Sequence, residues 1–346
     1  MNKKLLEQII HCISPSGKED MLQQCLYSNY KNTFDEFIVR DQGSLIGVLN
    51  KDADFKILLA AHADEISLIV TGHNSDGTLE VESNGGIRAQ LYAGTKVQVL
   101  TKNGIYKGVV GTNSAINKNG NLKASDLFVD MGCTSKEEVS KLVPKGSYIV
   151  HDTEMIELQN NRLAARAFDD RIGVYIIFEA AKKAKEKGAN VGIYACATTG
   201  EETTGRGSYE CSSFVNPNVC VAVDVTYAND YKGSDESGDV EIGKGGVICE
   251  GSIPNSKLNE LLAECAKSLN LPIQYEVFAG RTGTDADTMI KTESGITQTL
   301  FSIPLRYMHS PIELLSIDDV DSMVEILSEF LVRLNKEYSL NPYELK

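Results

Sequence analysis

Continuous apolar runs constrain the fold of this chain more than any other feature of its sequence. They lack the polar alternation of half-exposed strands and are typical of strands buried on both faces. They are KILLAA at 56–61, NVGIYACATT at 190–199, NVCVAVDV at 218–225 and TQTLFSIP at 297–304. Segments with helical spacing of apolar residues, such as 172–188 and 255–270, lie between them. This alternation predicts an α/β fold, with a mostly parallel sheet and helices on both faces.

The pattern changes between residues 66 and 155. Here short β-type runs such as ISLIVTGH, TKVQVLTKNG and GSYIVHDT are separated by Gly, Asn and Asp. Many short strands at regular spacing predict a small β-barrel or sandwich. We therefore expect a main domain formed by residues 1–65 and 156–346, with a second, β-rich domain inserted at 66–155.

Charge and cysteine content narrow the class of protein. The formal net charge of -14 argues against binding to nucleic acid or to an anionic membrane. The eight cysteines include no C-x-x-C pair, which favours free thiols in a reducing compartment. Neither a secretory signal nor a run of membrane-spanning length is evident, so we expect a cytoplasmic protein.

Histidines and carboxylates follow the predicted strands where these end. Ligands of open α/β sheets bind beyond the carboxyl ends of the strands, so we expect these side chains to meet there. The candidates are His62 and Asp64 after the first run, Glu201 and Glu202 after the second, Asp224 within the third, His309 after the fourth, and Asp169 and Asp170 before the long helix.

The chemistry of these candidates favours a pair of metal ions. Imidazole and carboxylate donors without thiolates suit a hydrolytic zinc or cobalt site, and about five ligands can hold two ions about 3.5–4 Å apart. Asp64 is expected to accept the second ring N–H of His62. One of Glu201 and Glu202 is expected to bind metal, while the other acts as general base. Each motif alone is more typical of surface or helix-capping residues, except Asp224, whose burial in an apolar run requires a partner.

Several motifs, in order along nearly the whole chain, resemble one known family. They are SPSGKE at 14–19, AHADEI at 61–66, DLFVDMG at 126–132, NRLAARAFDDRIG at 161–173, TTGEETTGRG at 198–207, AVDVT at 222–226, GTDAD at 283–287 and RYMHSPIELLS at 306–316. Together they resemble the TET-type dinuclear metallo-aminopeptidases, the forty-second metallopeptidase family. This family includes glutamyl and deblocking aminopeptidases and some members labelled as endoglucanases.

The resemblance implies a zinc-exopeptidase-like fold and a role for each candidate. The implied ligands of two divalent ions, Zn or Co, are His62, Asp169, Glu202, Asp224 and His309. Asp169 would bridge the ions, and the peptide bond between Asp169 and Asp170 would be cis. Glu201 would be the general base. The implied reaction removes N-terminal residues from short peptides by means of water activated by the two metals. The inserted domain would make dimer contacts, and the dimers would assemble into a hollow tetrahedral dodecamer.

Some positions depart from the family pattern and bear on specificity. Gly200 stands where the family usually has Gln, and TNSAINKNGN at 112–121 replaces a usual His-containing loop. Arg281 and Arg306 are candidates for contact with the substrate, and a guanidinium at Arg281 would favour an acidic first residue. The alternative for Arg281 is an ion pair with Asp285 or Asp287.

Two other functions compete with the aminopeptidase. One is a non-catalytic metal-binding or assembly protein that retains the fold. The other is a glycoside hydrolase, which needs two carboxyls flanking a sugar bond and aromatic platforms. The absence of Trp from the chain speaks against the second alternative.

Overall fold

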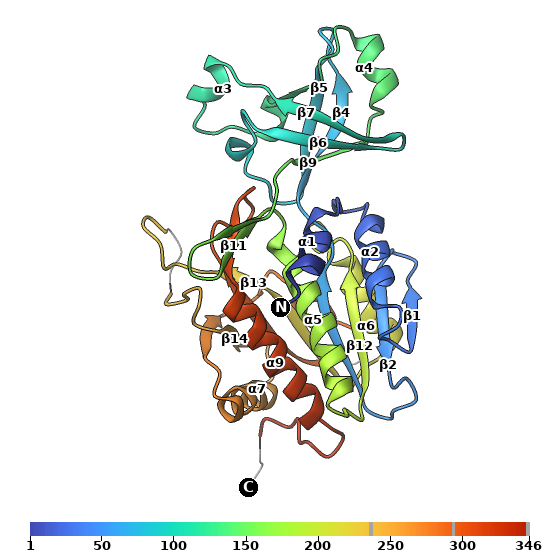
Figure 1. Cartoon of the computed structure of the whole chain (residues 1–346), viewed down its shortest axis with the longest axis vertical. Helices are drawn as coiled ribbons and strands as arrows, with labels where there is room; N and C mark the ends of the chain where they lie inside the picture. The colour runs from blue at the N-terminus through green and yellow to red at the C-terminus, as the bar shows by residue number, and fades with distance from the viewer. Residues whose placement is uncertain (235–237, 293–294, 344–346) are drawn as a thin grey trace.

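The computed structural model describes residues 1–234, 238–292 and 295–343. A large α/β body includes both ends of the described chain, and a smaller barrel projects from one end of this body (Figure 1). Within the described residues, none of the helices is both long enough and apolar enough to cross a bilayer.

An eight-stranded sheet forms the centre of the body. Its strands, in spatial order, are β1 (Glu36–Val39), β2 (Leu45–Leu49), β12 (Gly192–Thr198), β3 (Lys56–His62), β13 (Val219–Tyr227), β16 (Thr297–Leu305), β14 (Gly246–Gly251) and β15 (Ile273–Phe278). The four central strands, from β12 to β16, are parallel, and antiparallel pairs join them to the strands on either side. The predicted mostly parallel sheet is confirmed, with its apolar runs at the centre.

Helices cover both faces of this sheet, as predicted. One face packs on α1 (Lys3–His11), α2 (Asp20–Tyr30), α5 (Phe168–Glu186), α7 (Ser256–Leu269) and α9 (Ile317–Arg333), and the other on α6 (Arg206–Val215) and α8 (Ala286–Met289). Along β3, Ile57 and Leu59 belong to the first core, whereas Leu58 and Ala60 belong to the second. A strand with a core on each side has no exposed face, which explains the absence of polar alternation in its sequence.

The inserted segment forms a closed barrel with its own core. Around the barrel the strands are β4 (Ser67–His73), β5 (Leu79–Asn84), β8 (Phe128–Asp130), β7 (Gly104–Val110), β6 (Lys96–Thr101) and β9 (Tyr148–His151). Short helices decorate it: η1 (Ala89–Leu91), α3 (Ser114–Lys118), η2 (Ala124–Asp126) and α4 (Lys136–Leu142). Inward-facing residues such as Val70, Val81 and Val99 fill its interior, which is separate from the cores of the body.

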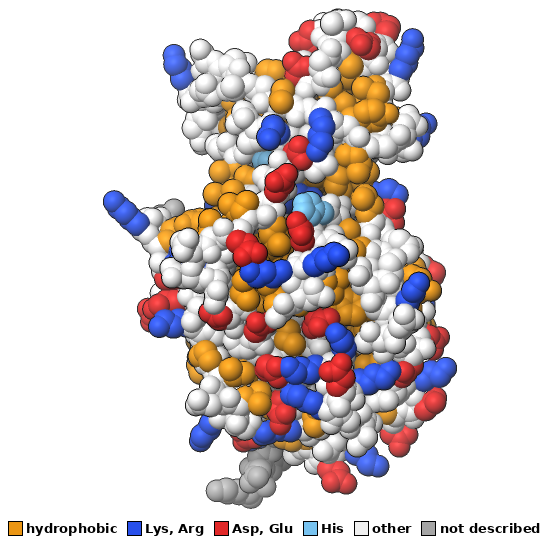
Figure 2. All heavy atoms as spheres, in the orientation of Figure 1, with side chains coloured by type: hydrophobic (Ala, Val, Ile, Leu, Met, Phe, Trp, Pro, Cys, Tyr) orange, Lys and Arg blue, Asp and Glu red, His pale blue; other side chains and the backbone are white. Residues whose placement is uncertain are grey.

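A small sheet lies where the chain returns from the barrel to the body. It is formed by β10 (Ile156–Leu158), β11 (Arg162–Ala165) and β17 (Glu313–Ser316). On the face shown in Figure 2, apolar side chains gather at the narrow waist between barrel and body. Acidic and basic side chains intermingle over the body below, without a continuous basic patch on this face.

Candidate active site

Strand register brings the predicted residues to one edge of the central sheet. His62 is the last residue of β3 and lies opposite Thr198 at the end of β12. On the other side Ala60 pairs with Ala222, so Asp224, two residues further along β13, extends to the level of His62. Glu201 and Glu202 follow β12 within the next turn. The carboxyl ends of three neighbouring parallel strands therefore converge, as expected for an open α/β sheet.

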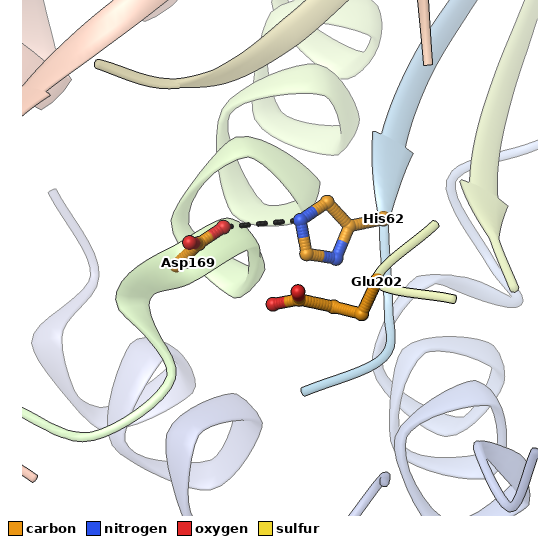
Figure 3. A group of neighbouring side chains, drawn as sticks. All are labelled: His62, Asp169 and Glu202. Atoms are coloured by element: carbon orange, nitrogen blue, oxygen red, sulfur yellow. Dashed lines mark hydrogen bonds and ion pairs between the residues drawn. The ribbon is translucent and has the colours of Figure 1, made fainter. Parts of the chain in front are cut away.

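The carboxylate of Asp169 lies between two imidazole rings. Its Oδ1 is 3.0 Å from Nε2 of His62, and its Oδ2 is 3.2 Å from Nε2 of His309. In Figure 3, Asp169, His62 and Glu202 point toward a common centre from the start of α5, the end of β3 and the segment after β12. Asp169 precedes the regular part of α5, and its peptide bond to Asp170 is cis.

Other carboxylates divide the cluster into two halves. Asp224 Oδ1 lies 3.9 Å from Nε2 of His62, whereas Glu202 Oε1 lies 3.6 Å from Nε2 of His309. We call the group around His62 and Asp224 the first position and the group around His309 and Glu202 the second position. Asp169 presents one oxygen to each. Glu201 is on the side of the first position, with Oε2 4.0 Å from Nε2 of His62.

Backbone carbonyls orient both imidazole rings. Nδ1 of His62 is 3.1 Å from the backbone oxygen of Asp64, and Nδ1 of His309 is 3.0 Å from the backbone oxygen of Gly86. With a cation in place, a proton donated from Nδ1 to these acceptors would leave the lone pair of each Nε2 free to bind it. Both rings are thus oriented to present Nε2 as a ligand.

Asp64 does not hydrogen-bond to the His62 ring with its carboxylate, in contrast to the sequence prediction. The sequence suggested its carboxylate as the partner of His62, but Oδ1 is 3.6 Å from Nδ1, beyond hydrogen-bond range. Its two carboxylate oxygens instead accept the backbone N–H groups of Glu201, at 3.0 Å, and of Glu202, at 3.2 Å. The buried Asp64 carboxylate therefore fixes the turn that presents both glutamates.

The electrostatics of the cluster fit bound cations. Burial raises the pKa of Asp224 and of Glu202 well above the range of an ordinary carboxyl. Burial acts the same way on Asp169, but hydrogen bonds from His309 and His62 hold its pKa below its ordinary value. Several buried carboxylates are costly to ionise together unless a cation compensates them. Imidazole and carboxylate donors that converge in this way could hold divalent cations.

Asp170, one of the candidates, and Glu313, which was not among them, support this cluster. The carboxylate of Asp170 accepts the backbone N–H of His62 and that of Gly173, each at 3.1 Å. The carboxylate of Glu313 accepts the backbone N–H of Asp169 at 3.1 Å and that of His309 at 2.9 Å. Glu313 stands in the apolar stretch IELLS, so the signal that singled out Asp224 also applies to it.

The two candidate arginines lie outside this cluster and have acidic partners of their own. Arg281 is largely exposed, and its Nε donates to Asp287 at 3.1 Å, which is one of the pairings considered from the sequence. Arg306 donates to the carboxylate of Asp230 from Nε at 2.7 Å and from Nη2 at 2.6 Å. Within the described part of the chain, neither arginine forms a hydrogen bond or ion pair with the residues of the two positions.

The backbone conformation at residue 200 favours glycine. Gly200 adopts a φ of +67°, a region that L side chains rarely occupy. A Cβ at this position would lie 2.9 Å from Cζ of Arg206 and 3.0 Å from its Nη1. The guanidinium of Arg206 thus occupies space that a side chain at this position would need.

The Gly200→Gln variant is therefore expected to be less stable than the natural protein. Left-handed strain costs about 1–2 kcal/mol for an L residue, and Arg206 would also have to move and give up its contact with Glu19, whose Oε1 lies 3.4 Å from Nη2 of Arg206. Gly146→Gln is the matched control, because Gly146 has a φ of +82° but no heavy atom within 4 Å of its Cβ position. Urea unfolding should show a larger loss of free energy for Gly200→Gln. Equal losses would mean that the crowding by Arg206 is not significant.

Comparisons with known proteins identify the family. The model of the M42 glutamyl aminopeptidase family matches residues 43–326. Lysyl aminopeptidase of Pyrococcus furiosus is 32% identical over 341 residues, covering 96% of this chain and 97% of its own. A TET aminopeptidase from a marine sediment Thaumarchaeota archaeon has a TM-score of 0.90 and 29% identity, covering 97% of this chain and 98% of its own. The Pyrococcus horikoshii TET1 peptidase, which can assemble into a tetrahedron or a large octahedral shell, has a TM-score of 0.85 and 27% identity, covering 96% and 99%. These matches show that the chain belongs to the M42 peptidase family.

Proposed function

We propose that two divalent cations and Glu201 carry out the aminopeptidase reaction that membership of this family supports. The single observation behind the proposal is the Asp169 carboxylate, which presents one oxygen to His62 and the other to His309. Together with its neighbours, a carboxylate shared in this way could help to hold two cations. The reaction is release of the N-terminal residue from short peptides.

The ligands fall into the two positions described above. His62 and Asp224 would hold one cation and His309 and Glu202 the other, with Asp169 shared between them. When bound, the cations would supply Lewis acidity, which polarises a scissile carbonyl and makes water a stronger acid. Asp170, Asp64 and Glu313 use their carboxylates on backbone N–H groups, so we assign them to support of the ligands.

Glu201 is the best placed general base. Its backbone is fixed by Asp64, and its carboxylate lies beside the first position without a hydrogen bond to another side chain among the described residues. Burial raises the pKa of Glu201 to about 9. Nearby cations would favour its ionised form, so that it can take a proton from the attacking water and pass it to the leaving amine.

The same cluster would favour peptides with a free α-amino group, the substrates of an exopeptidase. A free α-amino group is a cation or a nitrogen donor, and both forms suit a pocket lined with buried carboxylates. An acylated amine lacks this charge and basicity, so N-blocked peptides are expected to be rejected. The non-catalytic alternative has no comparable support, and the glycoside hydrolase has only the endoglucanase name of two structures with a similar fold, whereas the curated relatives are named aminopeptidases.

Two arginines and the barrel complete the proposal. Arg306 and Arg281 are candidates for substrate contact, and the terminal nitrogens of Arg281 have no hydrogen bond within the described chain.

For the barrel we propose a role in dimer contacts, leading to a closed dodecamer. The exposed Ile105 and Val109 on β7 support such an interface. So does the assembly of the related Pyrococcus horikoshii peptidase into closed shells.

The Glu201→Gln variant tests the role of the base. We expect the turnover of a leucyl anilide to fall at least about a hundredfold, with two metal equivalents retained because Glu201 is not proposed as a ligand. Metal content is measured on the same preparations, and Glu186→Gln, an exposed change on α5, serves as control. Wild-type turnover in metal-loaded Glu201→Gln would exclude this role.

The Arg281→Ala variant tests the arginine at the substrate side. If the exposed guanidinium contacts an acidic first residue, its removal should lower the ratio of glutamyl to leucyl turnover about threefold. The ratio of kcat/KM for the two anilides is the measurement, since it cancels differences in active fraction. An unchanged ratio would leave Arg281 with its ion pair to Asp287 and no part in specificity.

A further inference from the structure

A turn of the inserted barrel reaches the second position. Gly85 and Gly86, which we call the glycine turn, follow β5 and precede η1. The backbone oxygen of Gly86 lies 3.0 Å from Nδ1 of His309, across a separation of 223 residues in sequence. The barrel therefore provides the acceptor that orients one of the two proposed histidine ligands.

The glycine turn packs too closely on this position to admit side chains freely. A Cβ on Gly86 would lie 3.1 Å from Cε1 and 3.2 Å from Nδ1 of His309. A Cβ on Gly85, whose φ is +91°, would lie 2.9 Å from Cγ2 of Ile66 and 3.5 Å from Cβ of Glu202. The turn thus lies against both residues that distinguish the second position from the first.

The two histidines differ in how the structure holds them. His62 ends a central strand, is 2% exposed, and donates to the backbone of Asp64 only two residues away. His309 lies in the connection between β16 and β17, with a φ of +60° and a side chain that is 23% exposed. Glu313 holds the backbone of His309, but among the described residues only Gly86 accepts from Nδ1 of its ring.

We propose that Gly86 is a positioning residue through which the barrel sets the metal affinity of the second position alone. This inference rests on the proposed two-metal function. An acceptor on the far nitrogen of a ligating imidazole fixes its tautomer and orientation, and its loss typically weakens metal affinity 10–100-fold. The first position, formed entirely by the body of the protein, does not depend on the glycine turn.

Metal titration of the Gly86→Ala variant is the test. Chelator-stripped protein is titrated with Co²⁺ by calorimetry, and the visible absorption of bound cobalt is recorded in parallel. Gly120→Ala is the matched control, because Gly120 is also in the inserted segment and has no heavy atom within 4 Å of its Cβ position. The methyl group added in Gly86→Ala would press on the His309 ring at 3.1–3.2 Å and push it away from the carbonyl that orients it. We therefore expect one of the two equivalents to bind at least about tenfold more weakly in Gly86→Ala, with the other unchanged and the control like the natural protein.

The outcomes separate the inference from the function on which it rests. If the natural protein does not bind two equivalents, the proposed two-metal function fails. If it binds two and Gly86→Ala binds both equally well, the positioning role fails and the function stands. Equal weakening of both equivalents also overturns the inference, because the effect would not be confined to the second position.

A second measurement uses the natural protein and does not depend on the folding of the variant. Protein labelled with ¹⁵N-histidine and loaded with Zn²⁺ is examined by NMR for ring N–H signals, and His309 is assigned by the signal lost in His309→Gln. We expect the Nδ1–H of His309 and that of His62 both to exchange slowly with water. Exchange of the His309 proton as fast as that of the exposed His11 would overturn the inference.

Discussion

The arrangement of this site depends on one carboxylate shared by two imidazoles. Asp169 faces His62 with one oxygen and His309 with the other, and both contacts are short. The remaining features place or neutralise this group: Glu313 holds its backbone, Asp170 holds that of His62, and Asp64 presents the two glutamates. So many buried carboxylates in one place are unfavourable without positive charge, which is why the donor set points to cations rather than to a structural hydrogen-bond network.

The fold could be predicted from the sequence because its strands have distinctive patterns of apolar residues. A core on each side of β3 removes polar alternation, and the switch to short alternating strands marks the barrel. The candidate site was accessible for a related reason: carboxylates and histidines at the ends of parallel strands meet by topology. His62, Asp224, His309 and the two glutamates required only their positions at strand ends, and Asp169 required only its position before the long helix. The family motifs were needed in addition to assign each residue as metal ligand or base.

Contacts made by backbone atoms could not be predicted from the sequence in this way. A carbonyl carries no residue type, so nothing in the sequence connects Gly86 with His309. Asp64 was expected to bind the His62 ring because of its spacing, yet its carboxylate reaches the backbone of a turn more than a hundred residues away. Gly200 looked like a departure from the family pattern, whereas its positive φ and the guanidinium of Arg206 show what the local backbone requires. Long-range packing decides such contacts, and local patterns do not encode it.

A panel of aminoacyl substrates is the sharpest test of whether this protein is a metal-dependent aminopeptidase. Aminoacyl anilides and their N-acetylated counterparts are offered to chelator-stripped protein before and after refilling with Zn²⁺ or Co²⁺. We expect no cleavage by the stripped protein and cleavage of only the free-amine substrates after refilling. Cleavage of the acetylated anilides at similar rates, or no cleavage with two metals demonstrably bound, would contradict it.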